Sequence, residues 1–229
     1  MSKLVIGVTV ILFTILIYIL ARALHKRFPL PITIPILVAT IIGVVFLLLF
    51  RIPYETYMIG GEWIEWLLGP AIVALAYPLY QQWEMLKKYP LSIFIGVIVG
   101  ASTGVTVAIL LAKLVQLDEE IILSLIPLNS TTAVATEVAK AIGGIPSMTA
   151  LFVMIAGIGG AVIGPAVLRW CKVHHYLGRG VGMGAASHAI GTSKILEEGL
   201  QEGAASSVSM TITAVVISII SPIAVFIFF

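Results

Sequence analysis

Two polar stretches interrupt an otherwise apolar chain, and their side chains are the ones that could do chemistry. One covers residues 129–132 and the other residues 187–194. Inside hydrocarbon, a hydroxyl, amide or imidazole finds no water, so such groups normally face the protein interior or a wet cavity. We therefore predict a solute-binding site that contains Asn129, Ser130, Thr131, Thr132, Ser187, His188, Thr192 and Ser193.

The first stretch follows Pro127 and has the residue types that begin a helix. Proline disfavours helix in the residue before it, and Asn, Ser and Thr cap a new helix. A helix that restarts near Thr132 would present free amides and a partial positive charge, which suits a carboxylate. The alternative is that the hydroxyls bond back to their own helix. Four polar residues after a proline favour the break.

Three charged residues near these stretches are candidate charge or coupling partners. Glu137 and Lys140 lie three residues apart, so on a helix they share a face, and a structural ion pair is the first interpretation. The alternative makes Glu137 a carrier of a proton or cation. Lys194 ends the second polar stretch. The sequence leaves open whether protons or Na⁺ are coupled.

The second stretch is rich in glycine and contains one histidine. The glycines before it let the backbone approach closely or open a helix, but no phosphate loop is expected, because no strand precedes and no Lys-Ser follows. His188 is either a packing residue or a site residue that donates to a carboxylate. Ser187 and His188 are neighbours, so on a helix they point about 100° apart and form no nucleophile–base pair. We expect no enzymatic activity, no metal site and no cofactor.

Composition indicates an all-α integral membrane protein. Of 229 residues, 60% are apolar and 10% are charged, and the mean hydropathy is +1.13. Such a chain has room for roughly seven or eight membrane segments in a single polytopic domain over residues 1–229. A net charge of +2 excludes nucleic acid as an expected partner. The single cysteine, Cys171, excludes an intrachain disulfide.

Several segments read as clean spans, namely residues 4–21, 31–50, 91–112, 148–168 and 204–229. We keep the first as a mature helix rather than a signal peptide, because its basic cluster follows the apolar run. The acidic residues Glu55, Glu62 and Glu65 are assigned to a loop. Within residues 63–83, a kinked or discontinuous helix is expected, because three residues break helical hydrogen bonding: Gly69, Pro70 and Pro78.

The topology of the second half has two interpretations. Counted from an external N-terminus, the basic loops after the first and third spans lie in the cytoplasm. If residues 121–142 cross fully, Arg169, Lys172 and Arg179 face outside, against the positive-inside trend. A re-entrant hairpin through residues 129–132 would restore the trend.

The two halves, residues 1–114 and 121–229, are alike in plan without an evident sequence repeat. Each places clean helices around an interrupted element, as inverted-repeat carriers do. Gly96, Gly100 and Gly104 form a small-residue ridge that suits close helix packing. Together with the apolar surface, this ridge makes a homodimer plausible.

Three ordered motifs, in residues 69–80, 127–144 and 184–192, resemble the LrgB/CidB family over nearly the whole chain. The resemblance implies holin- or antiholin-like proteins in murein hydrolase control and cell lysis, in the bacterial cytoplasmic membrane. Relatives in plastids move glycolate and glycerate, and bacterial pairs move pyruvate with a small LrgA/CidA-type membrane partner. The LrgB/CidB family is also placed among bile-acid and arsenite type carriers, which implies crossed discontinuous helices and elevator motion.

One motif departs from the family pattern. Where members have Pro-Lys-Ser-Val-Thr-Thr-Pro-Ile-Ala, residues 127–135 keep the Thr-Thr pair but replace the lysine by Leu128 and the second proline by Ala133. Loss of the lysine removes a carboxylate partner, for which the helix N-terminus, His188 and Lys194 could substitute. The main hypothesis is a carrier of small carboxylates by alternating access. The alternative is a holin-like component that permeabilises the membrane or modulates a partner.

Overall fold

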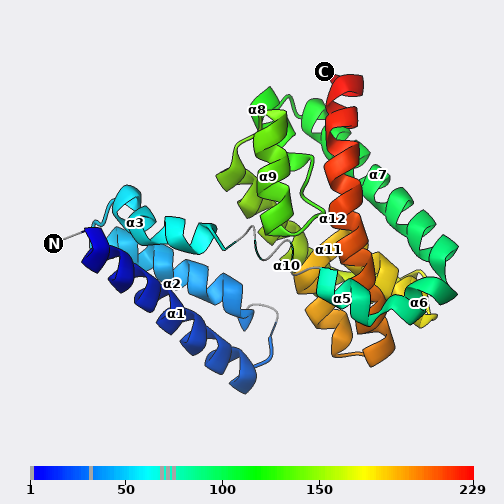
Figure 1. The fold of residues 1–229 in the computed structure, drawn as a ribbon, viewed down its shortest axis with the longest axis horizontal. Coiled ribbons are helices and arrows are strands. Elements are labelled where there is room, and N and C mark those ends of the chain that lie inside the picture. Colours follow the sequence, from blue (N-terminus) through cyan, green and yellow to red (C-terminus); the bar gives the residue numbers. More distant parts are fainter. Residues whose placement is uncertain (1–2, 31–32, 68–69, 71–72, 74–75) are drawn as a thin grey trace. The chain divides into compact units, whose positions relative to one another are not determined.

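The computed structural model describes residues 3–30, 33–67, 70, 73 and 76–229. These residues fall into two compact units, Met1–Ala71 and Ile72–Phe229, and each is described by itself. The long regular elements in both units are helices, and the described ranges contain no strand (Figure 1). The all-α prediction is confirmed for this part of the chain.

The first unit has three helices: α1 (Lys3–Arg27), α2 (Pro35–Leu49) and α3 (Tyr54–Glu65). α1 packs against both others. The contact between α1 and α3 depends on glycine, because a Cβ at Gly60 would lie 2.6 Å from the Gly7 carbonyl oxygen and 2.8 Å from Val10 Cβ. The Trp63 ring covers Gly7 from the other side of the contact. Two backbones therefore approach closely in this unit.

The prediction of a loop around Glu55, Glu62 and Glu65 is wrong, since all three lie in α3. The helix follows Pro53, whose extended backbone provides the N-cap, and Glu55 stands in the first turn, where a carboxylate suits the helix dipole. Packing on α1 then stabilises a helix that polarity alone would not predict.

The prediction that residues 63–83 do not form one continuous helix is confirmed for the described residues. α3 ends at Glu65, and α5 (Ala76–Gln81) and α6 (Trp83–Lys88) follow. Pro78 lies within α5 and Pro70 has helical backbone, whereas Gly69 lies outside the described residues.

The second unit holds the two polar stretches. Its further helices are α7 (Pro90–Leu114), α8 (Glu119–Leu125), α9 (Thr132–Ile142), α10 (Pro146–Trp170), α11 (Tyr176–Leu196) and α12 (Leu200–Phe228). By length and composition, α1, α7, α10 and α12 could each cross a membrane, and α2 is a shorter apolar helix. The count of seven or eight segments stays a prediction.

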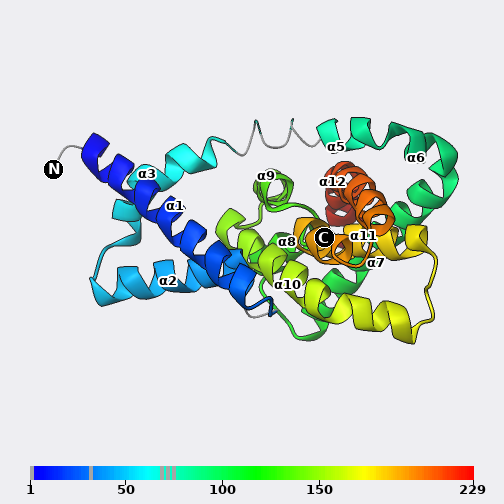
Figure 2. The same cartoon turned by 90° about the horizontal axis from the view of Figure 1, so that it is seen from below.

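α8 and α9 form a helical hairpin. Ser124 near the end of α8 and Ile145 after α9 would be roughly 30 Å apart on a straight helix, yet the Ile145 amide donates to Ser124 Oγ at 2.7 Å. A Cβ at Gly144 would lie 2.9 Å from the Ser124 amide nitrogen. The chain therefore turns back between the helices, and Figures 1 and 2 show them side by side. We call residues 126–131 the first tip.

α11 also folds back, although it is helical on both sides of the turn. His188 has φ 40° and ψ −132° inside it. Glu198, beyond its end, pairs with Arg179 in its first turn, whereas a straight helix would hold them roughly 28 Å apart. Glu198 also lies 3.7 Å from Arg169 at the end of α10. Residues 187–192 are the second tip.

The apolar core of this unit is divided between the two hairpins. One cluster joins α8 to the C-terminal halves of α7 and α12. The other joins the first arm of α11 to the N-terminal halves of the same two helices. The tips point from opposite ends toward the middle of α7 and α12.

Candidate functional site

Both hairpins contact the middle of α7. The Asn129 side chain lies against Gly104, where any Cβ would overlap its amide group. One helical turn earlier, Gly100 faces Ala185 of α11, with 3.3 Å between an added Cβ and the Ala185 Cβ. The glycine ridge therefore packs against both hairpins within the chain. The ridge is therefore not free to form the homodimer contact that the sequence analysis considered for it.

The first tip has hydroxyls that no described residue satisfies. Thr131 is the N-cap of α9, with φ −68° and ψ 148°, but its side chain makes no capping bond. Ser130 is 0% exposed and Thr131 is 9% exposed, and neither hydroxyl has a hydrogen-bond partner among the described residues. Buried hydroxyls without partners are rare. The predicted helix break is present, and it leaves donors next to the free amides of a helix N-terminus.

The alternative of back-bonding applies further along α9. Thr136 Oγ1 donates to the Thr132 carbonyl oxygen at 2.9 Å, and the Thr132 side chain itself is exposed. Back-bonding therefore begins one turn after the tip and does not satisfy Ser130 or Thr131.

The second tip differs, because His188 and Thr192 are bonded within the protein. His188 is 3% exposed, and its Nε2 lies 3.0 Å from the Val153 carbonyl oxygen, so Nε2 carries the hydrogen. Thr192 Oγ1 donates to the His188 carbonyl oxygen at 2.7 Å. Because this uses its one hydrogen, Ser206 of α12 donates to Thr192, at 2.8 Å.

The remaining predicted residues of the second stretch make local contacts. Ser187 is 1% exposed and lies against Gly160 of α10, where a Cβ would overlap its hydroxyl. Ser193 is exposed and bonds back to the Ala189 carbonyl oxygen at 3.0 Å. Lys194 pairs with Glu197 at 2.6 Å on the same arm.

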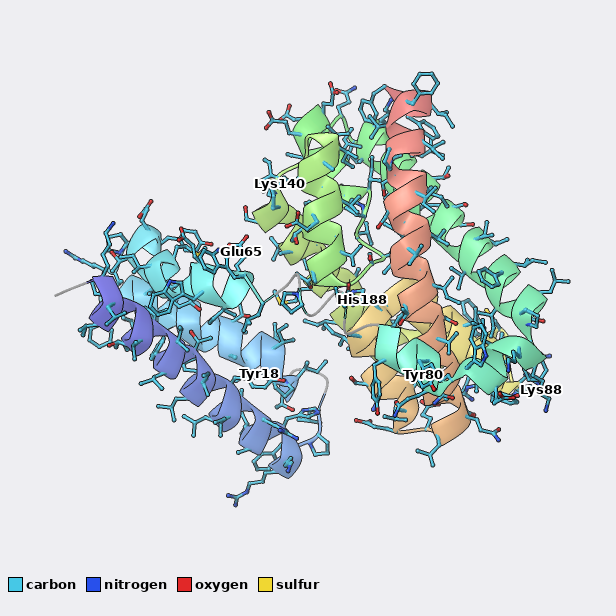
Figure 3. The ribbon with its side chains drawn as sticks, in the orientation of Figure 1. Tyr18, Glu65, Tyr80, Lys88, Lys140 and His188 are labelled. Atoms are coloured by element: carbon cyan, nitrogen blue, oxygen red, sulfur yellow. The ribbon has the colours of Figure 1, made fainter. Side chains whose placement is uncertain are left out.

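The predicted ion pair between Glu137 and Lys140 is wrong. Both side chains are exposed on α9, and the described part of the chain has no salt bridge between them. A shared face permits contact on a helix but does not require it when both side chains are free to extend outward. Figure 3 shows Lys140 on α9 and His188 in the interior of the second unit.

Hydroxyls of α12 join the site, and the sequence analysis missed them. Ser206, Ser209 and Thr213 are each 0% exposed, and their spacing puts them on one helix face. The Thr213 hydroxyl has no partner among the described residues. The next residue, Ala214, packs with Val134 of α9, one turn beyond the first tip. The helical spacing of these hydroxyls in the last span was the signal that could have identified them.

The arrangement offers groups that can bind a solute. The three unpartnered hydroxyls, Ser130, Thr131 and Thr213, are neutral donors and acceptors. The described residues contain no group of three or more His, Cys, Asp or Glu side chains that could hold a metal ion. Such a set can bind the oxygens of a polar solute.

Comparison with known proteins gives a consistent result. The profile of the LrgB-like family matches residues 14–227. The uncharacterized protein YxaC of Bacillus subtilis is 46% identical over 228 residues, which cover 100% of this chain and 99% of YxaC. The holin-like protein CidB of Staphylococcus aureus is 36% identical over 230 residues and 100% of both chains. CidB of Staphylococcus epidermidis is 35% identical over 97% of each. No solved structure matches.

Proposed function

Because this chain belongs to the LrgB-like family, we propose that it is a holin-like membrane component of the bacterial cytoplasmic membrane. The name holin-like, printed for its CidB relatives, and the four apolar helices support this role. In this function, the protein assembles in the membrane and permeabilises it, or modulates a partner that controls murein hydrolase activity and lysis. A homodimer and a small LrgA/CidA-type membrane protein are the proposed partners.

A second candidate function, a carrier of small carboxylates, is favoured by one observation. Among the described residues, Ser130 and Thr131 are buried hydroxyls without partners at the N-terminus of α9, and Thr213 of α12 is a third. A pore-forming or purely structural role does not need such groups, and leaving each unbonded costs about 1–3 kcal/mol. A bound solute would satisfy them.

The chemistry of this tip selects a small anion. The first amides of α9 point out of the helix and carry a partial positive charge, which attracts a carboxylate. Ser130 and Thr131 add hydroxyl donors beside these amides. Thr213 approaches from α12 and suits a hydroxyl or oxo group on the same solute. Pyruvate, glycolate and glycerate carry one carboxylate and one such group.

No cation is required in this arrangement, which compensates for Leu128 in place of the family lysine. Lys194 pairs with Glu197 and His188 with Val153, so the helix terminus takes over the role that these two side chains were predicted to fill. Glu137 is the candidate for proton coupling, because it is exposed on the helix that begins at the site. Uptake by Glu137→Gln with unchanged pH dependence would remove that role.

Reconstitution distinguishes the two functions. The purified chain is placed in proteoliposomes, and uptake of labelled pyruvate, glycolate and glycerate is measured beside leakage of a trapped dye. A carrier gives saturable uptake that Thr131→Ala reduces at least about tenfold, the effect of removing a hydrogen bond to a charged group. Thr136→Ala is the matched control, because Thr136 is bonded to its own helix. Dye leakage that is independent of solute supports the holin-like function instead.

A further inference from the structure

The segments α7–α9 and α10–α11 share a plan that was not visible in the sequence. α7 and α10 are both 25 residues long, and each begins with a proline. Each ends in the same way, with a left-handed residue of φ 56° at the same distance from that proline, Gln116 in one and Lys172 in the other. In both, the next amide bonds back to the last turn of the helix. Each helix then leads into a hairpin.

The match extends to the side chains that are buried. When Pro90 is aligned with Pro146, the buried residues Ile93, Val97, Ala101, Val105 and Ile109 of α7 fall on Thr149, Val153, Gly157, Ala161 and Pro165 of α10, which are also buried. The same alignment places Gly104 on Gly160. These two glycines are the ones that Asn129 of the first tip and Ser187 of the second tip contact. Each long helix thus has a glycine at one register position that receives a hairpin tip.

The two segments run in opposite directions. The start of α7 lies beside the start of α11, where the Tyr89 and Tyr176 rings are 6.4 Å apart. Arg169, at the end of α10, is near Glu198 at that same end of the unit. At the other end, Lys113 of α7 bonds to the Phe228 carbonyl oxygen of α12. The first end carries Lys87, Lys88, Arg169, Lys172 and Arg179 together with Glu84 and Glu198. The second end carries Lys113 with Asp118, Glu119 and Glu120.

We propose that the two hairpins are inverted copies that enter the membrane from opposite faces, each acting as the gate of the site on its own face. The α11 hairpin opens toward the cytoplasm, because its end of the unit has the larger number of Lys and Arg residues, which is the quantity that sets orientation. The α8–α9 hairpin opens toward the outside. This inference rests on the proposed carrier function only in treating the tips as a solute site, since the topology can be tested without a solute.

The α11 gate is held shut by an ionic latch. Glu198 joins the second arm of the hairpin to Arg179 on the first arm and to Arg169 on α10. The Arg179 side chain is 15% exposed, so this pair is partly shielded from solvent. Glu197, the adjacent residue, pairs only with Lys194 on its own arm and ties nothing across the hairpin.

The topology is tested by labelling single cysteines from each face of sealed vesicles with a membrane-impermeant maleimide. Val115→Cys and Ser147→Cys, both in a Cys171→Ser background, flank the α8–α9 hairpin, and the native Cys171 and Gln201→Cys flank the α11 hairpin. We expect the first two positions to label from one face and the other two from the opposite face. Gln201→Cys is also made in the Cys171→Ser background, so that each variant has a single cysteine. If either hairpin crosses fully, its two flanking positions label from opposite faces, which overturns the proposal.

The latch is tested with Thr213→Cys in the Cys171→Ser background, because Thr213 carries one of the buried hydroxyls assigned to the site. Adding Glu198→Gln should raise its labelling rate from the cytoplasmic face about fivefold, as expected when a pair that favours closure is lost. Glu197→Gln should leave the rate unchanged. Arg169→Gln, which removes the longer contact, should give a smaller rise. Equal rates for the two glutamate variants, or a rise from the outer face, would overturn the gate assignment.

Discussion

The two hairpins of the second unit have the same plan but opposite polar character at their tips. The first tip holds Ser130 and Thr131, which are buried and unbonded. The second tip holds His188 and Thr192, which are bonded to α10 and through Ser206 to α12. One tip therefore has capacity left for a ligand, whereas the other uses its polar groups to hold a strained turn. The difference shows that a buried polar side chain in a membrane protein indicates a binding site only where it has no hydrogen-bond partner within the protein.

The largest effect is expected from the packing that both hairpins share. Gly160→Val would place side-chain atoms where the Ser187 hydroxyl lies, and overpacking against the second tip should cost about 3 kcal/mol. Thermal unfolding of the purified protein measures the loss. Gly159→Val is the matched control, because an added Cβ there meets nothing within 4 Å. Equal destabilisation by the two variants would contradict the contact.

A smaller loss should follow from breaking a bond at the second tip. Thr192→Val leaves the Ser206 hydroxyl buried without its partner, which should lower the free energy of unfolding by about 1–3 kcal/mol. Ser193→Ala, at the exposed neighbour, should change it by less than about 0.5 kcal/mol. If Thr192→Val has no greater effect than its neighbour, the second tip is not the bonded one of the pair.

Backbone strain at His188 should make the glycine variant more stable than the alanine variant, which is the reverse of the order in an ordinary helix. Both His188→Ala and His188→Gly lose the bond to the Val153 carbonyl oxygen. Glycine adopts φ 40° without a Cβ penalty, so His188→Gly should be more stable than His188→Ala by about 1 kcal/mol. Unfolding midpoints of the two variants, compared at equal detergent concentration, provide the test. In an ordinary helix the alanine variant would be the more stable.

The smallest change in stability belongs to the first tip. Ser130→Ala removes a buried hydroxyl that has no partner, so the free energy of unfolding should shift by less than about 0.5 kcal/mol or increase. Solute uptake should fall nonetheless, because the hydroxyl bonds only when the site is filled. A clear destabilisation would show that Ser130 is bonded within the fold and that the two tips are alike.

Local signals in the sequence were sufficient for the break at the first tip. Pro127 disfavours a continuing helix, and the Asn, Ser and Thr residues after it are typical of a helix start. α9 begins at Thr132, where predicted. Four of the five clean spans were also predictable, because apolar length determines them; residues 91–112, for example, correspond to α7. The fifth, residues 31–50, contains the shorter helix α2.

Non-local features were not predictable in the same way. The turn at His188 depends on Gly157 and Gly160 of α10 receiving the tip, and no neighbour of His188 in sequence indicates a positive φ. The unbonded state of Thr213 was hidden for a related reason. The spacing of the α12 hydroxyls indicates a shared polar face. Hydroxyls in apolar helices usually bond to their own backbone, however, so spacing alone does not show which of them is left unbonded.

The division of the apolar core has a consequence for how this unit comes apart. One cluster surrounds α8 and the other surrounds α11, with the polar tips between them. Apolar contacts couple neighbouring residues during unfolding, and a layer of hydroxyls interrupts that coupling. The second unit should therefore behave as two cooperative subdomains stacked along α7 and α12, and amide hydrogen exchange should show two separate protection levels that meet at the tips.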